Sequence, residues 1–123
     1  MGNGKKNILI VDDSRTVRQL LKMVLSRNID SALTEAEDGQ EAYEMLKKNR
    51  FDLIITDINM PRMCGLSLVN RIRGEMESDT PIIIVTTMGH EGDRDIGLKM
   101  GANTYITKPI NGNSLIEAVK GLI

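Results

Sequence analysis

The stretch Ile8-Leu9-Ile10-Val11-Asp12-Asp13 decides how this chain folds, because a run of apolar residues leads directly into two acidic ones. A short, nearly continuous apolar run is typical of a strand buried on both faces of a parallel sheet. Similar runs occur at residues 32–36, 53–56, 82–86 and 105–107. Together with residues 7–11, these runs predict five strands.

Segments with a helical period separate the predicted strands. The first helix is predicted from a stripe spaced i, i+3, i+4, i+7 and i+8, which is the pattern of one buried helix face. This stripe comprises Val17, Leu20, Leu21, Val24 and Leu25. Further stripes at residues 66–72 and 115–123 predict two more helices.

Residues at the predicted helix ends agree with these assignments. Asp38 and Asn111 are suited to cap helices at their N-termini, and Gly101 is suited to end one. The helix predicted over residues 90–100 contains Gly92 and Gly97. Each glycine in a helix interior costs about 1 kcal/mol relative to alanine, so we expect this helix to be weak.

The alternation of strands and helices predicts an α/β fold, a doubly wound parallel sheet with helices on both faces. Five strand–helix units are too few for an eight-stranded barrel. The 123 residues fit one domain spanning residues 1–123.

Composition limits the function and location of the chain. The 16 basic and 17 acidic residues leave no basic excess, which argues against nucleic-acid binding. Cys64 is the only cysteine, so an internal disulfide is excluded and a reducing compartment is expected. No apolar run approaches the roughly 20 residues that span a bilayer, and the N-terminus lacks the apolar stretch of a signal peptide. We therefore expect a cytoplasmic protein that contacts no membrane.

Polar side chains follow four of the five predicted strands. Asp12 and Asp13 follow the first, Asp57 follows the third, Thr86 ends the fourth, and Lys108 follows the fifth. Ligands of open α/β sheets bind beyond the carboxyl ends of the strands, so we expect these residues to lie close together. Each residue alone is better explained as a cap, a strand residue or a surface charge, but their joint occurrence favours a site.

The charges of these residues indicate the chemistry of that site. Three neighbouring carboxylates repel one another unless positive charge compensates them. Mg²⁺, which prefers oxygen ligands, and Lys108 together balance the three negative charges. In such a site the Asp57 carboxylate can attack a phosphoryl group, and Thr86 and Lys108 can donate to its oxygens.

The chain resembles the receiver domains of bacterial two-component response regulators, of the CheY-like single-domain type, from about Asn7 to the C-terminus. The matching segments are Ile8–Ser14, Asp57-Ile58-Asn59-Met60-Pro61, Pro81–Thr86, Gly101-Ala102 and Lys108-Pro109. The resemblance implies a flavodoxin-like sheet of five strands in the order 2-1-3-4-5 with five helices. It also implies a cis peptide bond before Pro109.

The resemblance implies roles for the acidic residues. Asp57 corresponds to the residue that accepts a phosphoryl group from the phosphohistidine of a sensor histidine kinase in a Mg²⁺-dependent reaction. Asp13, Asp57 and the backbone carbonyl of Asn59 correspond to Mg²⁺ ligands, and Asp12 corresponds to a residue that binds the metal mostly through water.

The resemblance also implies a switch. Thr86 and Lys108 correspond to residues that contact the phosphoryl group, and Tyr105 to an aromatic residue that swings inward when Thr86 moves. The face of the fourth helix, fifth strand and fifth helix then binds a downstream target protein. We expect a monomer or weak dimer that catalyses only its own phosphorylation and dephosphorylation, with chemotaxis as one candidate pathway.

Three alternatives stay open at this stage. The chain also fits a receiver fragment of a larger response regulator or hybrid kinase, which is the first alternative to a single-domain switch. A Mg²⁺-dependent aspartyl phosphatase is less favoured, because the chain has no cap region to enclose a substrate. A flavodoxin-like electron carrier is disfavoured by the 2% aromatic content. Cys64 departs from the family pattern, which commonly has Asp there, and we interpret it as a tolerated loop residue.

Overall fold

The fold is a five-stranded parallel sheet with helices on both faces. The computed structural model describes residues 5–87 and 91–123. The elements are β1 (Lys6–Val11), α1 (Arg15–Asn28), β2 (Ser31–Ala36), α2 (Gly39–Lys48), β3 (Leu53–Asp57), α3 (Gly65–Asn70), the π-helical turn η1 (Arg71–Glu75), β4 (Ile82–Thr87), α4 (Glu91–Met100), β5 (Thr104–Lys108) and α5 (Gly112–Leu122). The strand order is β2-β1-β3-β4-β5, which confirms the predicted fold class and topology.

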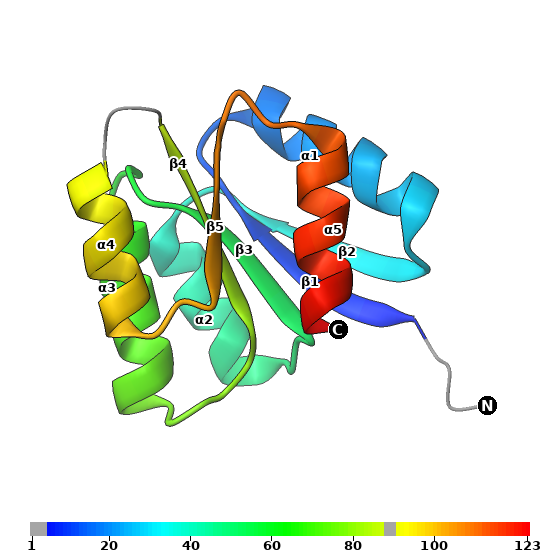
Figure 1. The fold of residues 1–123 in the computed structure, drawn as a ribbon. Helices are drawn as coiled ribbons and strands as arrows, with labels where there is room; N and C mark the ends of the chain where they lie inside the picture. Colours follow the sequence, from blue (N-terminus) through cyan, green and yellow to red (C-terminus); the bar gives the residue numbers. More distant parts are fainter. Residues whose placement is uncertain (1–4, 88–90) are drawn as a thin grey trace.

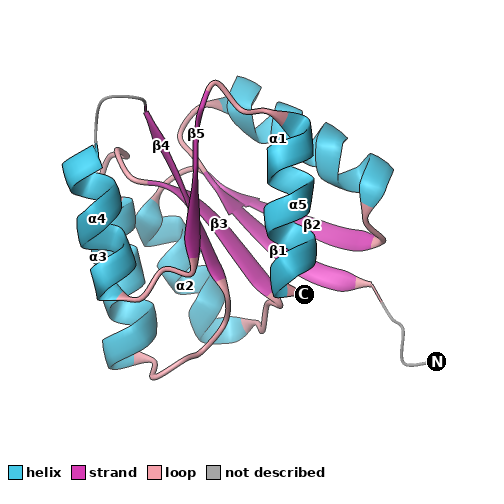
Figure 2. Cartoon of the chain, in the orientation of Figure 1, coloured by secondary structure: helices cyan, strands magenta, loops and turns pink. Residues whose placement is uncertain are grey.

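Two apolar layers hold the sheet between its helices. Helices α1 and α5 cover one face, and α2, α3 and α4 cover the other (Figures 1 and 2). Alternate residues of β1 supply both layers, with Ile8 and Ile10 on the α1/α5 side and Leu9 and Val11 on the other. All five residues of β3 are buried, which explains why its sequence shows no polar alternation.

The predicted helix caps are confirmed. The Asp38 carboxylate accepts the Glu41 N–H at 2.8 Å, and the Asn111 side chain accepts the Ser114 N–H at 3.0 Å. Gly101 follows α4 with a φ of 123°, a left-handed conformation that favours glycine. The Lys108–Pro109 peptide bond is cis, as the family resemblance implied.

The buried face of α1 differs from its prediction. Leu21 and Leu25 pack into the core, but Leu20, predicted on the same face, is 37% exposed. Arg18 is only 7% exposed because its guanidinium turns inward toward the end of β1. The predicted apolar stripe was therefore too wide. The buried face of α1 includes the charged residue Arg18 beside Leu21, and it excludes Leu20.

Helices α3 and α4 also differ from what their sequences suggest. The stripe at residues 66–72 does not belong to one regular helix, because the α-helical turns end at Asn70 and η1 follows. Gly97 in α4 has a packing reason, since a Cβ there would lie 2.2 Å from Cδ1 of Ile84 on β4. His90, the predicted first residue of this helix, lies outside the described residues.

Gly65 allows the loop after β3 to fold back onto that strand. Its N–H donates to the Ile58 carbonyl at 2.8 Å. A Cβ at this position would lie 2.0 Å from the backbone carbonyl oxygen of Asp57. The first residue of α3 therefore packs directly against the backbone of Asp57.

We predict that Gly65→Ala destabilises the protein by about 1–3 kcal/mol, the usual cost of forcing an extra methyl group into a packed site. Gly121→Ala is the control, because no atom of the described residues beyond the neighbouring helix backbone lies within 4 Å of its added Cβ. That control is expected to be neutral or stabilising by up to about 1 kcal/mol. Urea denaturation measures both, and equal stabilities for the two variants would contradict the packing argument.

Candidate functional site

Three acidic residues meet at the carboxyl edge of the sheet. Val11 pairs with Thr56 in the parallel register of β1 and β3, so the residues that follow them lie side by side. One carboxylate oxygen from each of Asp12, Asp13 and Asp57 lies within 4.8 Å of the others. Asp12 and Asp57 are buried, at 1% and 6% exposure, and Asp13 is exposed. The structure thus brings together the three acids predicted from sequence.

Lys108 reaches this cluster from the end of β5, two strands away from β3. Its Nζ lies 3.3 Å from Oδ2 of Asp12 and 3.4 Å from Oδ2 of Asp57. Burial by itself would lower the pKa of Lys108, but the charges of Asp57 and Asp12 outweigh it and raise that pKa. The ammonium therefore stays charged at neutral pH and offsets part of the acidic charge.

The carboxylate of Asp57 lacks sufficient positive charge around it. Its Oδ1 accepts the Ile58 N–H at 2.8 Å. Burial is the main cause that raises the pKa of Asp57, the charge of Asp12 adds to it, and Lys108 and the Ile58 N–H oppose it only in part. The protein by itself therefore disfavours the ionised form of this carboxylate.

Asp12 provides a direct test of whether a cation fits. Its Oδ1 accepts the Ser14 N–H at 2.8 Å. Its buried Oδ2 accepts no hydrogen bond from the described residues, since the Lys108 ammonium nearby is not aligned to donate. A buried anionic oxygen without an aligned donor, beside two further carboxylates, suits a hard divalent cation such as Mg²⁺. Asp12, Asp13 and Asp57 fit the Mg²⁺ site of a receiver domain.

The remaining predicted residues surround this cluster. Thr86 is buried and follows Val85, the residue that pairs with Asp57 in the register of β3 and β4. The Oγ1 of Thr86 lies 3.5 Å from the Thr87 carbonyl. A contact that long is at most a weak hydrogen bond. Asn59 is exposed in the loop two residues beyond Asp57.

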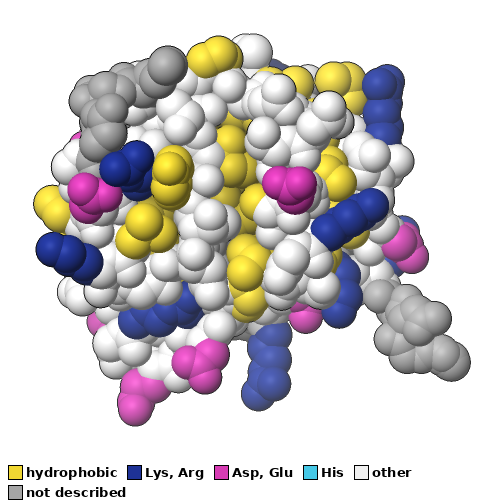
Figure 3. Space-filling model, viewed as in Figure 1, with side chains coloured by type: hydrophobic (Ala, Val, Ile, Leu, Met, Phe, Trp, Pro, Cys, Tyr) yellow, Lys and Arg dark blue, Asp and Glu magenta, His cyan; other side chains and the backbone are white. Residues whose placement is uncertain are grey.

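Tyr105 lies on the outer face formed by α4, β5 and α5. Its side chain is 38% exposed, and Arg94 of α4 stacks on its ring at 5.0 Å from the centroid. Arg94 Nη1 also lies 3.5 Å from the Tyr105 hydroxyl. Hydrophobic side chains are visible over this face in Figure 3. The predicted switch residue is thus in an outward position.

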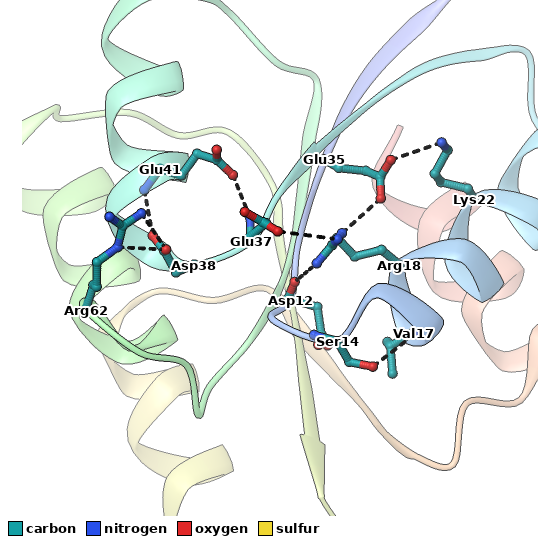
Figure 4. A network of polar contacts seen from close by, with 10 residues as sticks. All are labelled: Asp12, Ser14, Val17, Arg18, Lys22, Glu35, Glu37, Asp38, Glu41 and Arg62. Atoms are coloured by element: carbon teal, nitrogen blue, oxygen red, sulfur yellow. Dashed lines mark hydrogen bonds and ion pairs between the residues drawn. The ribbon is translucent and has the colours of Figure 1, made fainter.

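Sequence reasoning missed Arg18, which joins the site through the backbone. Its Nη1 donates to the Asp12 carbonyl at 2.6 Å, and its Nε donates to Glu35 Oε1 at 2.9 Å (Figure 4). The sequence signal for Arg18 was its position three residues before Leu21, on the buried face of α1.

Cys64 lies at the start of α3, where its Sγ is 3.5 Å from the Ser67 hydroxyl.

Comparison with known proteins agrees with this geometry. The pattern of the response regulator receiver domain matches residues 8–120. The Chemotaxis protein CheY homolog of Campylobacter jejuni is 42% identical over 118 residues, covering 94% of this chain and 91% of that protein. Transcriptional regulatory protein SrrA of Staphylococcus aureus is 40% identical over 94% of this chain, which spans about half of that protein (47%).

Solved structures show the same likeness. Chemotaxis response regulator CheY4 of Vibrio cholerae superposes with a TM-score of 0.87 at 32% identity, covering 97% of this chain and 99% of that one. Response regulator TrrA of Thermotoga maritima, in complex with Mg²⁺-BeF, superposes with a TM-score of 0.85 at 36% identity, covering 96% of this chain and 99% of that one.

An α/β domain with an acidic cluster and a lysine at the carboxyl edge of its sheet defines a class of phosphorylation-controlled signalling modules. This chain belongs to the response regulator receiver domain family and is CheY-like. Its function is phosphorylation-dependent two-component signalling, which involves a histidine kinase and a downstream target. None of the helices described is both long and apolar enough to cross a membrane.

We predict that Asp57→Asn stabilises the metal-free protein at pH 7. Because the pKa of Asp57 is raised above its ordinary 3.8, its charge destabilises the fold at high pH, and this cost disappears as the pH falls below that value. Like charges 4–5 Å apart repel by about 3–4 kcal/mol at an effective dielectric constant of about 20, and Lys108 offsets much of this, so a gain on the order of 1 kcal/mol is expected.

Urea denaturation with and without Mg²⁺ measures this effect. Saturating Mg²⁺ should narrow or reverse the difference, because binding stabilises the wild-type protein more. Asp30→Asn, a change at an exposed carboxylate, is the control and should stay within about 0.5 kcal/mol of wild type. A less stable metal-free Asp57→Asn variant would show that the repulsion is not dominant.

Proposed function

We propose that Asp57 accepts a phosphoryl group from the phosphohistidine of a sensor histidine kinase. The observation that carries this proposal is the meeting of three carboxylates within 4.8 Å, with the Lys108 ammonium 3.4 Å from Asp57. Asp12, Asp13, Asp57 and the backbone carbonyl of Asn59 would hold Mg²⁺, with Asp12 acting mostly through water. When bound, Mg²⁺ supplies positive charge that offsets the carboxylates and the phosphoryl oxygens.

The chain's own residues then account for the transfer. A carboxylate oxygen of Asp57 forms a bond to phosphorus as the bond from phosphorus to the histidine nitrogen breaks. The Ile58 N–H and Lys108 orient this carboxylate before the transfer. Afterwards the site carries an acyl phosphate with a charge of about −2 in place of the Asp57 charge of −1. Lys108 and Thr86 are the nearby donors for its oxygens.

We propose that this change of charge operates a switch. Among the described residues the Thr86 hydroxyl has only a weak backbone contact, so a strong new acceptor at Asp57 can draw it inward. Tyr105, held at the surface by Arg94, then moves into the space beside β4. The contacts that hold the outward state are weak, so a coupling of about 1–3 kcal/mol is enough to change the balance.

The target-binding surface is proposed to be the face of α4, β5 and α5. Exposed Tyr105 lies on it, and a hollow of about 640 Å³ between β5 and α5 is lined in part by Tyr105, Ala118 and Leu122. A switch at Tyr105 would change this face directly. We further propose a cytoplasmic monomer or weak dimer whose only catalysis is its own phosphorylation and dephosphorylation, within a chemotaxis-type or related pathway.

The first prediction of this proposal concerns Asp57 itself. Incubation with acetyl phosphate and Mg²⁺ should add one phosphoryl group, detected as a mass increase of the intact protein. Asp57→Asn should abolish the addition, whereas Asp52→Asn should retain it. Rapid turnover of many phosphate esters without a stable adduct would instead favour an aspartyl phosphatase.

The second prediction concerns the outward position of Tyr105. An exposed cation–π contact is worth about 0.5–1 kcal/mol. Arg94→Ala should therefore lower, by roughly twofold to fivefold, the beryllium fluoride concentration at which half of the protein has Tyr105 in the inward position. The readout is quenching of tyrosine fluorescence in a Tyr43→Phe background, where Tyr105 is the only tyrosine.

Lys99→Ala is the matched control, since it removes one exposed positive charge from the same helix. The control should titrate like wild type. If Arg94→Ala also titrates like wild type, the contact with Tyr105 does not bias the switch.

A further inference from the structure

Arg18 is a buried charge whose role the proposed chemistry leaves open. It is 7% exposed and lies beside the acidic cluster, between α1 and the ends of β1 and β2 (Figure 4). Burying a guanidinium is costly unless it is paired and hydrogen-bonded. Its partners therefore show what this position requires. They are the carbonyl of Asp12 at 2.6 Å and Glu35 Oε1 at 2.9 Å, with Glu37 Oε1 at 4.0 Å.

The contact with the Asp12 carbonyl fixes the backbone between two of the clustered acids. That carbonyl belongs to the peptide unit that links Asp12 to Asp13, and a peptide unit is planar. Holding its oxygen therefore fixes the direction in which the chain leaves Asp12 and enters Asp13. The Asp12 N–H is held as well, since it donates to the Ala36 carbonyl at 3.1 Å.

Glu35 on β2 determines where the guanidinium of Arg18 can point. Its Oε1 accepts from Arg18 Nε, and its Oε2 pairs with Lys22 Nζ at 3.0 Å. The pKa of Glu35 is held below its ordinary value, chiefly by the hydrogen bond from Lys22 and next by that from Arg18. The carboxylate thus stays ionised at neutral pH. The chain Glu35–Arg18–Asp12 carbonyl connects β2 and α1 to the acidic cluster at the end of β1.

We propose that Arg18, oriented by Glu35, is a positioning residue for the Mg²⁺ site. It touches none of the clustered carboxylates, and it acts by fixing the peptide between Asp12 and Asp13 so that both side chains face one point. This inference rests on the proposed function, because it assumes that the acidic cluster binds Mg²⁺. The guanidinium supplies two separate nitrogens, Nε to Glu35 and Nη1 to the Asp12 carbonyl, whereas the single nitrogen of a lysine cannot occupy both positions.

The test measures Mg²⁺ affinity in the unphosphorylated protein, by following backbone amide NMR signals during titration with MgCl₂. Loss of a residue that orients metal ligands typically weakens binding 10–100-fold, so Arg18→Lys is expected to raise the dissociation constant about tenfold. Glu35→Gln is the second variant, which leaves Arg18 in place and keeps the proposal testable if Arg18→Lys does not fold. Lys22→Ala is the control, because Lys22 pairs with Glu35 but has no contact with Asp12.

A second readout separates positioning from a general loss of stability. With acetyl phosphate as donor, saturating Mg²⁺ should restore the phosphorylation rate of folded Arg18→Lys or Glu35→Gln to that of wild type, so that only the Mg²⁺ requirement rises. Variants that bind Mg²⁺ within twofold of wild type, whatever their stability, would overturn the inference. So would a loss in Lys22→Ala as large as that in Glu35→Gln.

The outcome for the wild-type protein keeps this inference distinct from the proposed function. A wild-type chain that shows no Mg²⁺-dependent NMR shifts would refute the metal site itself. A wild-type chain that binds Mg²⁺, with unaffected Arg18 and Glu35 variants, would refute only the positioning role.

Discussion

The mutual repulsion of carboxylates at the carboxyl edge of the sheet is the constraint on which the rest of this structure depends. Asp12 and Asp57 are almost completely buried, and Asp13 adds a third charge within 4.8 Å. Without compensation, this arrangement opposes folding. Lys108 supplies one compensating charge, and the shortage that remains suits a divalent cation.

The scaffold around the cluster holds the acids in spite of that repulsion. Parallel pairing of β1 with β3 places Asp12 next to Asp57, and the buried apolar strands leave little freedom for either backbone to move. Gly65 lets the loop after β3 return onto the Asp57 carbonyl, and Arg18 ties the Asp12 carbonyl to α1 and β2. Backbone contacts thus hold the acids in position, while their side-chain charges continue to repel one another.

Thr86 and Tyr105, the two residues of the proposed switch, are held more weakly. Thr86 has a long contact to a backbone carbonyl, and Tyr105 is stacked at the surface by Arg94, which is itself half-buried. Surface contacts of this kind contribute about 1 kcal/mol or less. An increase of one negative charge in a partly buried site is a larger effect, so it can reorganise these contacts without disturbing the core. Weak outer contacts on a rigid sheet are the arrangement that population shift requires.

The sequence by itself determined the five strands, their helices and the residues that gather at one edge. It could do so because buried parallel strands need apolar runs, and because the carboxyl ends of such strands always lie on the same side of the sheet. The strand order came from family resemblance. The tertiary structure alone decided that Leu20 is exposed, that α3 ends at Asn70 and continues as η1, that Arg18 turns inward, and that Arg94 stacks on Tyr105. These features depend on which side chains meet across elements distant in the chain, and local periodicity carries no information about such partners.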